Sequence, residues 1–213
     1  MIYTFDKKDN YPKKYLTFII PIDDEKYDNG NVLEELRYNS LSNCNLSGND
    51  IKEYISKYYN DVLSKLDPLE IARELRCSIL VSNERSNSIA LRHIVSEWIS
   101  IYSDDYVVEV KKDNNDKYIK LDRPSFIKNM LIDVIKDSKD MKGFKSLRAL
   151  YLYEKSEELR NNAIILNEKT GNVFNHLLED SFRLKCKSKF EESNYNRKLV
   201  YDRSYYRRRN YKR

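Results

Sequence analysis

The stretch CSILVSNERSNSIALRHIVSEWISIY, residues 77–102, decides the fold class. Its beginning, residues 77–81, is an apolar run bounded by polar residues, which is typical of a buried central strand. A polar loop follows, and Ser88 is a suitable cap for the helix after it. The apolar residues of that helix recur at helical spacing, and they are Ile89, Ile94, Val95, Trp98 and Ile101. The stretch therefore predicts a strand, a loop and an amphipathic helix.

Two more helices are predicted upstream of this stretch. Residues 51–66 carry apolar side chains at helical spacing, with Asn49 or Asp50 as the cap. The pair Asp67-Pro68 is a strong start signal for the next helix, because Asp caps a helix and Pro suits its first position.

Short apolar runs predict the other strands, and they cover residues 15–22, 106–110 and 117–121. Helices and strands alternate over residues 50–110, which is the pattern of an α/β domain. We therefore expect an α/β fold with a small, partly parallel sheet flanked by helices, followed by a mostly helical extension and a basic tail.

The strand signals stop after Arg123-Pro124. Helices are predicted for residues 125–138, 144–161 and 173–189, whereas residues 190–213 have almost no periodic apolar pattern. The sequence thus predicts three parts: an α/β domain over residues 1–123, a helical extension over residues 124–190, and a tail rich in Tyr and Arg over residues 191–213.

The composition excludes several kinds of site. The 4 glycines are scattered, so they cannot form a phosphate-binding loop or a dinucleotide fingerprint. The 2 histidines cannot build a His-rich zinc site. Cys44, Cys77 and Cys186 lack the C-x-x-C spacing of a zinc knuckle, and their odd number does not indicate a disulfide framework. We therefore expect no metal and no cofactor.

Free thiols fit a reducing compartment. The N-terminal residues contain no apolar stretch long enough for a signal peptide. No stretch approaches the ~20 apolar residues that a membrane span requires. We expect a protein of the cytoplasm, bacterial or of a phage-infected host cell, with no membrane partner.

The positive charge is concentrated at one end of the chain. Residues 183–213 contain 12 Lys or Arg and 3 Asp or Glu, a net charge of +9, while the whole chain carries +5. The remaining residues therefore carry a net charge of −4, so the basicity belongs to the C-terminal segment.

This segment interleaves cations with tyrosines. Arg and Lys contact phosphates with release of counterions, and Tyr offers a flat face for base stacking. The candidate nucleic-acid-binding residues are Arg197, Lys198, Arg203, Tyr205, Tyr206, Arg207, Arg208, Arg209, Tyr211, Lys212 and Arg213. Single-stranded DNA or RNA is the expected ligand. A solvated charged tail and a tail that docks on an acidic protein surface are the alternatives.

The segment ILVSNERSNSIALRHIVSEWI, residues 79–99, resembles the family catalogued as domain of unknown function 488. Proteins of that family carry a strand ending in Cys-x-Glu, a short loop, and a helix that opens Cys-His-Arg. The start MIYTF and the upstream helix pair are similar to it as well, so the resemblance covers about residues 1–110.

This sequence departs from the family at the thiol positions. The strand-end Cys is Ser82 here, the helix-opening Cys is Ala90, and the family's His is Leu91. A thiolate nucleophile needs a Cys, so these departures favour a non-catalytic member of the family.

The polar residues left in the motif are Glu84, Arg92 and His93. They could form a remnant anion pocket at the end of a strand, or Glu84 and Arg92 could form an ion pair that only fixes the loop. Ser86 and Ser88 lie nearby, but no G-x-S-x-G elbow surrounds them.

Three functions follow from these features. The first is a non-catalytic protein that binds nucleic acid through its basic, Tyr-rich C-terminal arm. The second is a phage-encoded inhibitor that docks on a host or defence complex. The third is a nucleotide-directed hydrolase or transferase, in which Arg92 holds the anion and Glu84 or His93 transfers a proton.

Overall fold

The computed structural model describes residues 1–6, 15–22, 31–39, 47–82, 89–104, 107–113, 117–121 and 125–210. Side chains are described as far as Leu199, with those of Asp6 and Lys112 outside the description. The chain forms two compact units, Met1–Ser138 and Lys139–Arg213.

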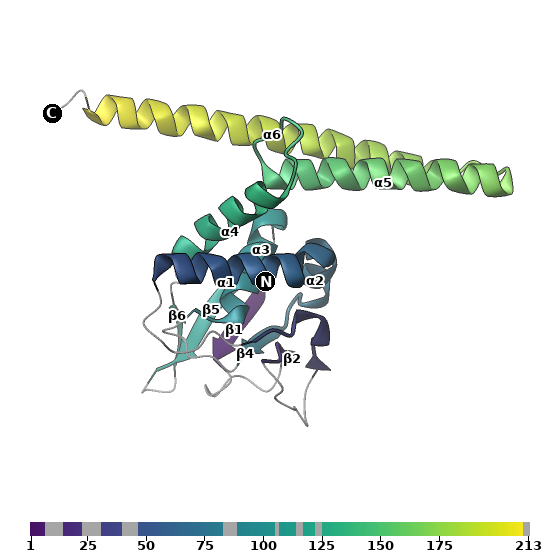
Figure 1. Ribbon diagram of the computed structural model, residues 1–213. Coiled ribbons are helices and arrows are strands. Elements are labelled where there is room, and N and C mark those ends of the chain that lie inside the picture. The colour runs from purple at the N-terminus through teal and green to yellow at the C-terminus, as the bar shows by residue number, and fades with distance from the viewer. Residues whose placement is uncertain are drawn as a thin grey trace. The chain divides into compact units, whose positions relative to one another are not determined.

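The first unit is built on a six-stranded sheet with the strand order β3-β2-β4-β1-β5-β6 (Figure 1). The strands are β1 (Ile2–Asp6), β2 (Thr17–Ile19), β3 (Asn31–Val32), β4 (Ile79–Ser82), β5 (Val107–Lys112) and β6 (Tyr118–Leu121). All neighbouring strands pair in parallel except β5 and β6, which pair antiparallel. The prediction of an α/β fold with a partly parallel sheet is therefore confirmed, and the run at residues 77–81 does lead into a central strand.

Four α-helices belong to this unit: α1 (Gly48–Asp61), α2 (Pro68–Glu74), α3 (Leu91–Tyr102) and α4 (Ser125–Ser138). Asp67 caps α2 as predicted, accepting from the amides of Leu69 and Glu70. The cap predicted for α1 is wrong, because Ser47 is the N-cap and Asp50 completes a capping box three residues later. The cap predicted for α3 is wrong too, because that helix begins after Ala90.

Helix α3 lies at the centre of the unit, in contact with β1, β4, α2 and α4. Every residue from Leu91 to Ile99 is buried, so the helix is enclosed on all sides. Side chains alternate between the two faces of a sheet. Phe5, Ile79 and Val108 belong to an apolar cluster on one face, so their neighbours Thr4, Leu80 and Glu109 point to the other.

The second unit is an antiparallel pair of helices, α5 (Leu147–Thr170) and α6 (Asn175–Asn210) (Figure 1). Helix α5 ends at Gly171, whose φ of 71° is the left-handed conformation in which glycine commonly ends a helix. Helix α6 continues past residue 189, where the sequence analysis placed its end, so most of the segment predicted as a tail has a helical backbone.

Small residues form the contact between α5 and α6. On α5, Ala149, Ser156 and Ala163 are buried at intervals of seven residues, the heptad repeat of a helix–helix seam. On α6, Ser181 donates to the carbonyl of Ser156 at 2.8 Å, and Ser188 donates to the carbonyl of Ala149 at 2.6 Å. A side chain as short as Ser can reach the opposite backbone only where the two helices lie close together, and the small residues permit that approach.

Glu192 marks the point where α6 passes the beginning of α5. Its carboxylate accepts from the backbone amides of Lys145 and Ser146, at distances of 3.0 to 3.2 Å. A carboxylate at this position also suits the positive end of the α5 dipole. The 18 residues 193–210 continue α6 past its partner by about 27 Å, at 1.5 Å per residue.

Candidate functional site

Arg92 is the centre of a buried polar cluster in the first unit. The side chain comes from the first turn of α3 and is 0% exposed. Its Nε and Nη2 donate to Oε1 of Glu109 at 3.1 and 3.0 Å, and its Nη1 donates to the Ser82 hydroxyl at 3.0 Å. Glu109 lies on β5 and Ser82 at the end of β4, so one guanidinium ties α3 to two strands.

Thr4 completes the cluster from β1. Strand pairing places Thr4 directly beside Glu109, and its hydroxyl contacts Oε2 of that carboxylate and the carbonyl of Val108. Both carboxylate oxygens of Glu109 therefore have protein partners. A buried charge is tolerated where it is paired and hydrogen-bonded in this way.

His93 lies beside the same carboxylate oxygen that Arg92 contacts. Its Nδ1 accepts from the backbone amide of Ala90 at 3.4 Å, so the proton of the neutral ring is assigned to Nε2. Nε2 lies 3.3 Å from Oε1 of Glu109, yet the alignment is not that of a hydrogen bond. The Nδ1 lone pair is already used, so the neutral ring offers no free nitrogen to act as a base in this arrangement.

Two opposing effects act on the pKa of Glu109. Burial raises it, but the contact with His93, the charge of Arg92 and the Thr4 hydroxyl outweigh burial and hold the pKa below its ordinary value. Because the His93 contact is poorly aligned, we attribute the stabilisation of the carboxylate chiefly to Arg92 and Thr4. The cluster thus holds an ionised carboxylate inside the unit.

The structure describes two of the three residues that the sequence predicted for this site, Arg92 and His93. Glu84 lies outside the described residues. Arg92 and His93 are brought together, but by Glu109, which the sequence analysis did not single out. In this arrangement both side chains are buried, so neither presents a face to an anionic ligand in solution.

One feature of the sequence could have identified Glu109. It is a single carboxylate within the run VVEV, and a charged residue in a buried strand needs a partner. Ser82, at the position where the family resemblance expects Cys, is a hydrogen-bond partner of Arg92. The cluster can therefore fix the sheet and α3 in place, and a structural role explains all its members.

The basic end of α6 is the second candidate site. Arg197 and Lys198 are exposed on the helix. Arg203, Tyr205, Tyr206, Arg207, Arg208 and Arg209 have a helical backbone, while their side chains are outside the description. Tyr211, Lys212 and Arg213 lie outside the described residues.

The cations of this end are distributed around the helix. Residues 193–210 contain six Lys or Arg and one acidic residue, Asp202. At about 100° per residue, positions 197, 198, 203, 207, 208 and 209 are spread around the circumference of the helical backbone. Such a helix can contact phosphates on more than one side.

Two other kinds of site are absent from the residues that the structure describes. Among the helices that the structure describes, none is long and apolar enough to cross a membrane. In that same part of the chain, no group of His, Cys, Asp and Glu is arranged to hold a metal ion.

The comparisons with known proteins leave the family resemblance a prediction. No family model matches the chain, and no curated protein or solved structure matches it either.

Proposed function

We propose that the protein binds nucleic acid through residues 193–213, which comprise the basic end of α6 and the three residues that follow it. One observation carries the proposal: α6 continues past the beginning of α5 as a helix that contains six Lys or Arg and one Asp in residues 193–210. Neighbouring cations repel each other along such a helix, and a polyanion relieves this repulsion while releasing its counterions.

The placement of the cations favours contacts to the phosphate backbone. A flexible single strand can follow the surface of the helix, so cations on several sides of the helix can each reach one of its phosphates. Tyr195, Tyr201, Tyr205 and Tyr206 add aromatic rings on which unpaired bases can stack. Single-stranded DNA or RNA, bound without strong sequence preference, is the expected ligand class.

The test is a salt titration of binding to a labelled single-stranded oligonucleotide, followed by fluorescence anisotropy. Each lost phosphate contact should reduce the slope of log affinity against log salt by about 0.7. Replacing Arg207, Arg208 and Arg209 with Gln should therefore lower the slope by about 2, and a chain ending at Glu192 should bind far more weakly.

The matched control replaces three exposed lysines of the first unit, Lys65, Lys111 and Lys117, with Gln. It removes the same charge from elsewhere and should leave the slope nearly unchanged. Equal losses in the two triple variants, or full binding by the shortened chain, would refute the proposal. A duplex of the same length, titrated in parallel, shows whether unpaired bases contribute.

A further inference from the structure

The basic end of α6 contains two pairs of neighbouring cations, Arg197-Lys198 and Arg208-Arg209. The pairs are eleven residues apart, which is about three turns plus 20° of an α-helix. They therefore lie in nearly the same direction from the helix axis, about 16 Å apart along it. Arg197 and Lys198, whose side chains the structure describes, are exposed. The two pairs thus share one side of the helix.

Tyr201 and Tyr205 occupy the same side, between the two pairs. Their positions are rotated from that of Arg197 by about 40° and 80°, inside the sector of about 120° that the four cations border. Every position of residues 197–209 within this sector holds a cation or a tyrosine. We call this sector the Tyr–cation stripe, and its members are Arg197, Lys198, Tyr201, Tyr205, Arg208 and Arg209.

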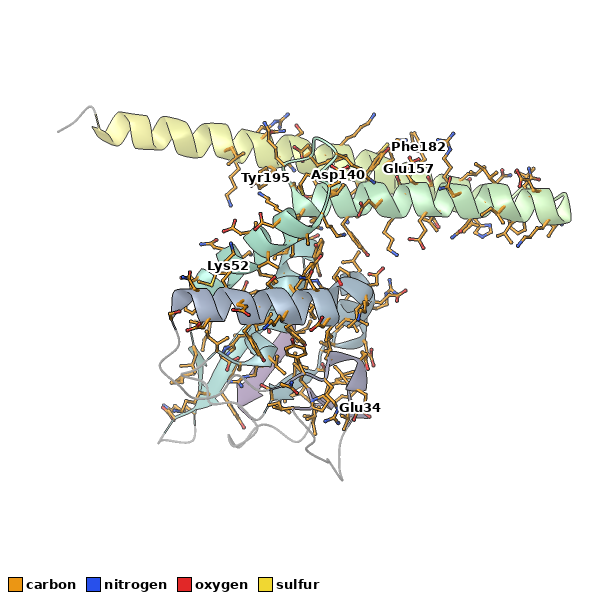
Figure 2. All side chains as sticks on the ribbon, in the orientation of Figure 1. Glu34, Lys52, Asp140, Glu157, Phe182 and Tyr195 are labelled. Atoms are coloured by element: carbon orange, nitrogen blue, oxygen red, sulfur yellow. The ribbon has the colours of Figure 1, made fainter. Side chains whose placement is uncertain are left out.

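The other two tyrosines of residues 193–210 lie outside the Tyr–cation stripe. The positions of Tyr195 and Tyr206 are about 100° and 120° from its middle, beside Asp202, the one acidic residue of this segment. Tyr195 is also half-buried, and Figure 2 labels it close to the point where α6 passes the beginning of α5. Aromatic and positive positions therefore coincide on one side of the helix, away from this second pair of tyrosines.

We propose that Tyr201 and Tyr205 stack bases of a single strand, while cations at both edges of the Tyr–cation stripe contact its phosphates. The proposal rests on the proposed function and adds which residues recognise unpaired bases. Every base has a flat face, so stacking of this kind tolerates any sequence. The bases of a duplex are already stacked and paired, so they offer the two rings no free face.

The spacing along the helix sets the length of strand that the site can hold. The positions of Tyr201 and Tyr205 are about 6 Å apart along the axis, and successive nucleotides of a stacked strand are about 3.4 Å apart. The two rings therefore suit bases about two nucleotides apart. By the same measure, the distance between the two cation pairs corresponds to about five nucleotides, within the range of single-strand binding sites.

The first experiment measures the affinity of the full chain for a labelled single strand of mixed sequence by fluorescence anisotropy. Stacking of one base on an aromatic ring is worth a factor of about 5 or more in affinity. Tyr205→Leu should therefore bind about 5-fold more weakly than the wild type, and Tyr201→Leu with Tyr205→Leu about 30-fold more weakly. Tyr205→Phe keeps the ring and should retain the affinity.

The matched control is Tyr206→Leu, which makes the same change at the neighbouring residue outside the Tyr–cation stripe. It should bind like the wild type. The slope of log affinity against log salt should be the same in all of these variants, because none of them loses a charge. A loss of affinity without a change of slope is the result that distinguishes stacking from phosphate contacts.

The second experiment leaves the protein unchanged, so it does not depend on the folding of any variant. It uses an abasic strand of the same length, which has the same phosphates and no bases. The wild type should bind this strand about as weakly as the double variant binds the normal strand. The double variant should lose nothing further on the abasic strand.

Three results would overturn the stacking site: equal losses in Tyr205→Leu and Tyr206→Leu, no loss in the double variant, or equal affinity of the wild type for the normal and abasic strands. Each of them leaves salt-dependent binding in place, so the proposed function survives. Binding that depends on the cations and on none of the rings would fit an acidic protein surface better than bases. A wild-type chain that binds neither strand would refute the proposed function and the stacking site together.

Discussion

Replacing Arg92 with Met removes one half of the buried ion pair and leaves Glu109 as a charged side chain with 2% exposure. Loss of one partner of such a pair costs about 3–5 kcal/mol, because the remaining charge has lost both its Coulomb partner and two hydrogen bonds. Glu109→Gln leaves Arg92 in the same position and should cost a similar amount. A domain is stable by only about 5–15 kcal/mol, so either variant removes a large part of the free energy of unfolding.

The double variant Arg92→Met with Glu109→Gln removes both charges. Its cost should be less than the sum of the two single costs by about 2 kcal/mol, since neither variant side chain leaves an isolated charge. Urea unfolding measures these free energies, with the fluorescence of Trp98 as the signal. Trp98 is the single Trp of the chain and lies buried on α3, the helix that carries Arg92.

The exposed pair of Arg37 and Glu34, 2.7 Å apart, is the matched control. Its side chains are 33% and 62% exposed, so the same pair of substitutions there should show little coupling. Two results would refute this reasoning: each single substitution at the buried pair costs less than about 1 kcal/mol of unfolding free energy, or the cost of the double variant equals the sum of the two single costs.

Three other predictions concern pH, the end of α5 and the helix contact. The folded state lowers the pKa of Glu109, so the ionised carboxylate stabilises the fold above the unfolded pKa of about 4.3. This stabilisation is lost as the pH falls through the folded pKa. The urea midpoint should therefore fall less steeply with decreasing pH in Glu109→Gln than in the wild type. Gly171→Ala should lower the free energy of unfolding by about 1–2 kcal/mol, because Gly171 has a φ of 71° that Ala adopts only with strain; urea unfolding followed by circular dichroism measures this. The control is Gly48→Ala, which should cost nothing, because the new methyl group meets open space and the position has no positive φ. By the same measurement, Ser188→Ala should lower the free energy of unfolding by about 1 kcal/mol, because the hydrogen bond to the Ala149 carbonyl is lost. Ser188→Leu should lower it further, because the larger side chain forces α5 and α6 apart. Equal effects of the two variants would argue against a close approach of the two helices.

The sequence predicted the elements of the first unit better than their ends. The predicted bounds of α4, residues 125–138, agree with the structure, because a regular apolar stripe identifies a helix that packs on one side. The predicted cap of α3 is wrong because the residue that precedes the helix is Ala90, which carries no capping oxygen. Instead, Nδ1 of His93 accepts from the Ala90 amide. A His in that role is too unusual for capping rules to detect.

The second unit was harder to predict because its contacts do not follow hydrophobicity. Ser156, Ser181 and Ser188 form the inner seam, while Phe182 and Phe190 lie outside, the reverse of the usual pattern. Periodicity of apolar residues therefore could not show where α6 ends. The sequence marks Glu109 as a buried carboxylate that needs a partner, but it does not identify Arg92 as that partner, since only the folded sheet brings Glu109 within reach of a residue 17 positions earlier.

The enclosure of α3 has a consequence for how the first unit opens. Amide protons from Leu91 to Ile99 lie within a helix that is buried on every side, so no local fluctuation can bring them to water. Their exchange with deuterated solvent should require loss of the whole unit and should report its global free energy of unfolding. The amides of α6 beyond Glu192, by contrast, exchange through fraying from a helix end, which makes the two parts of the chain distinguishable by time of exchange alone.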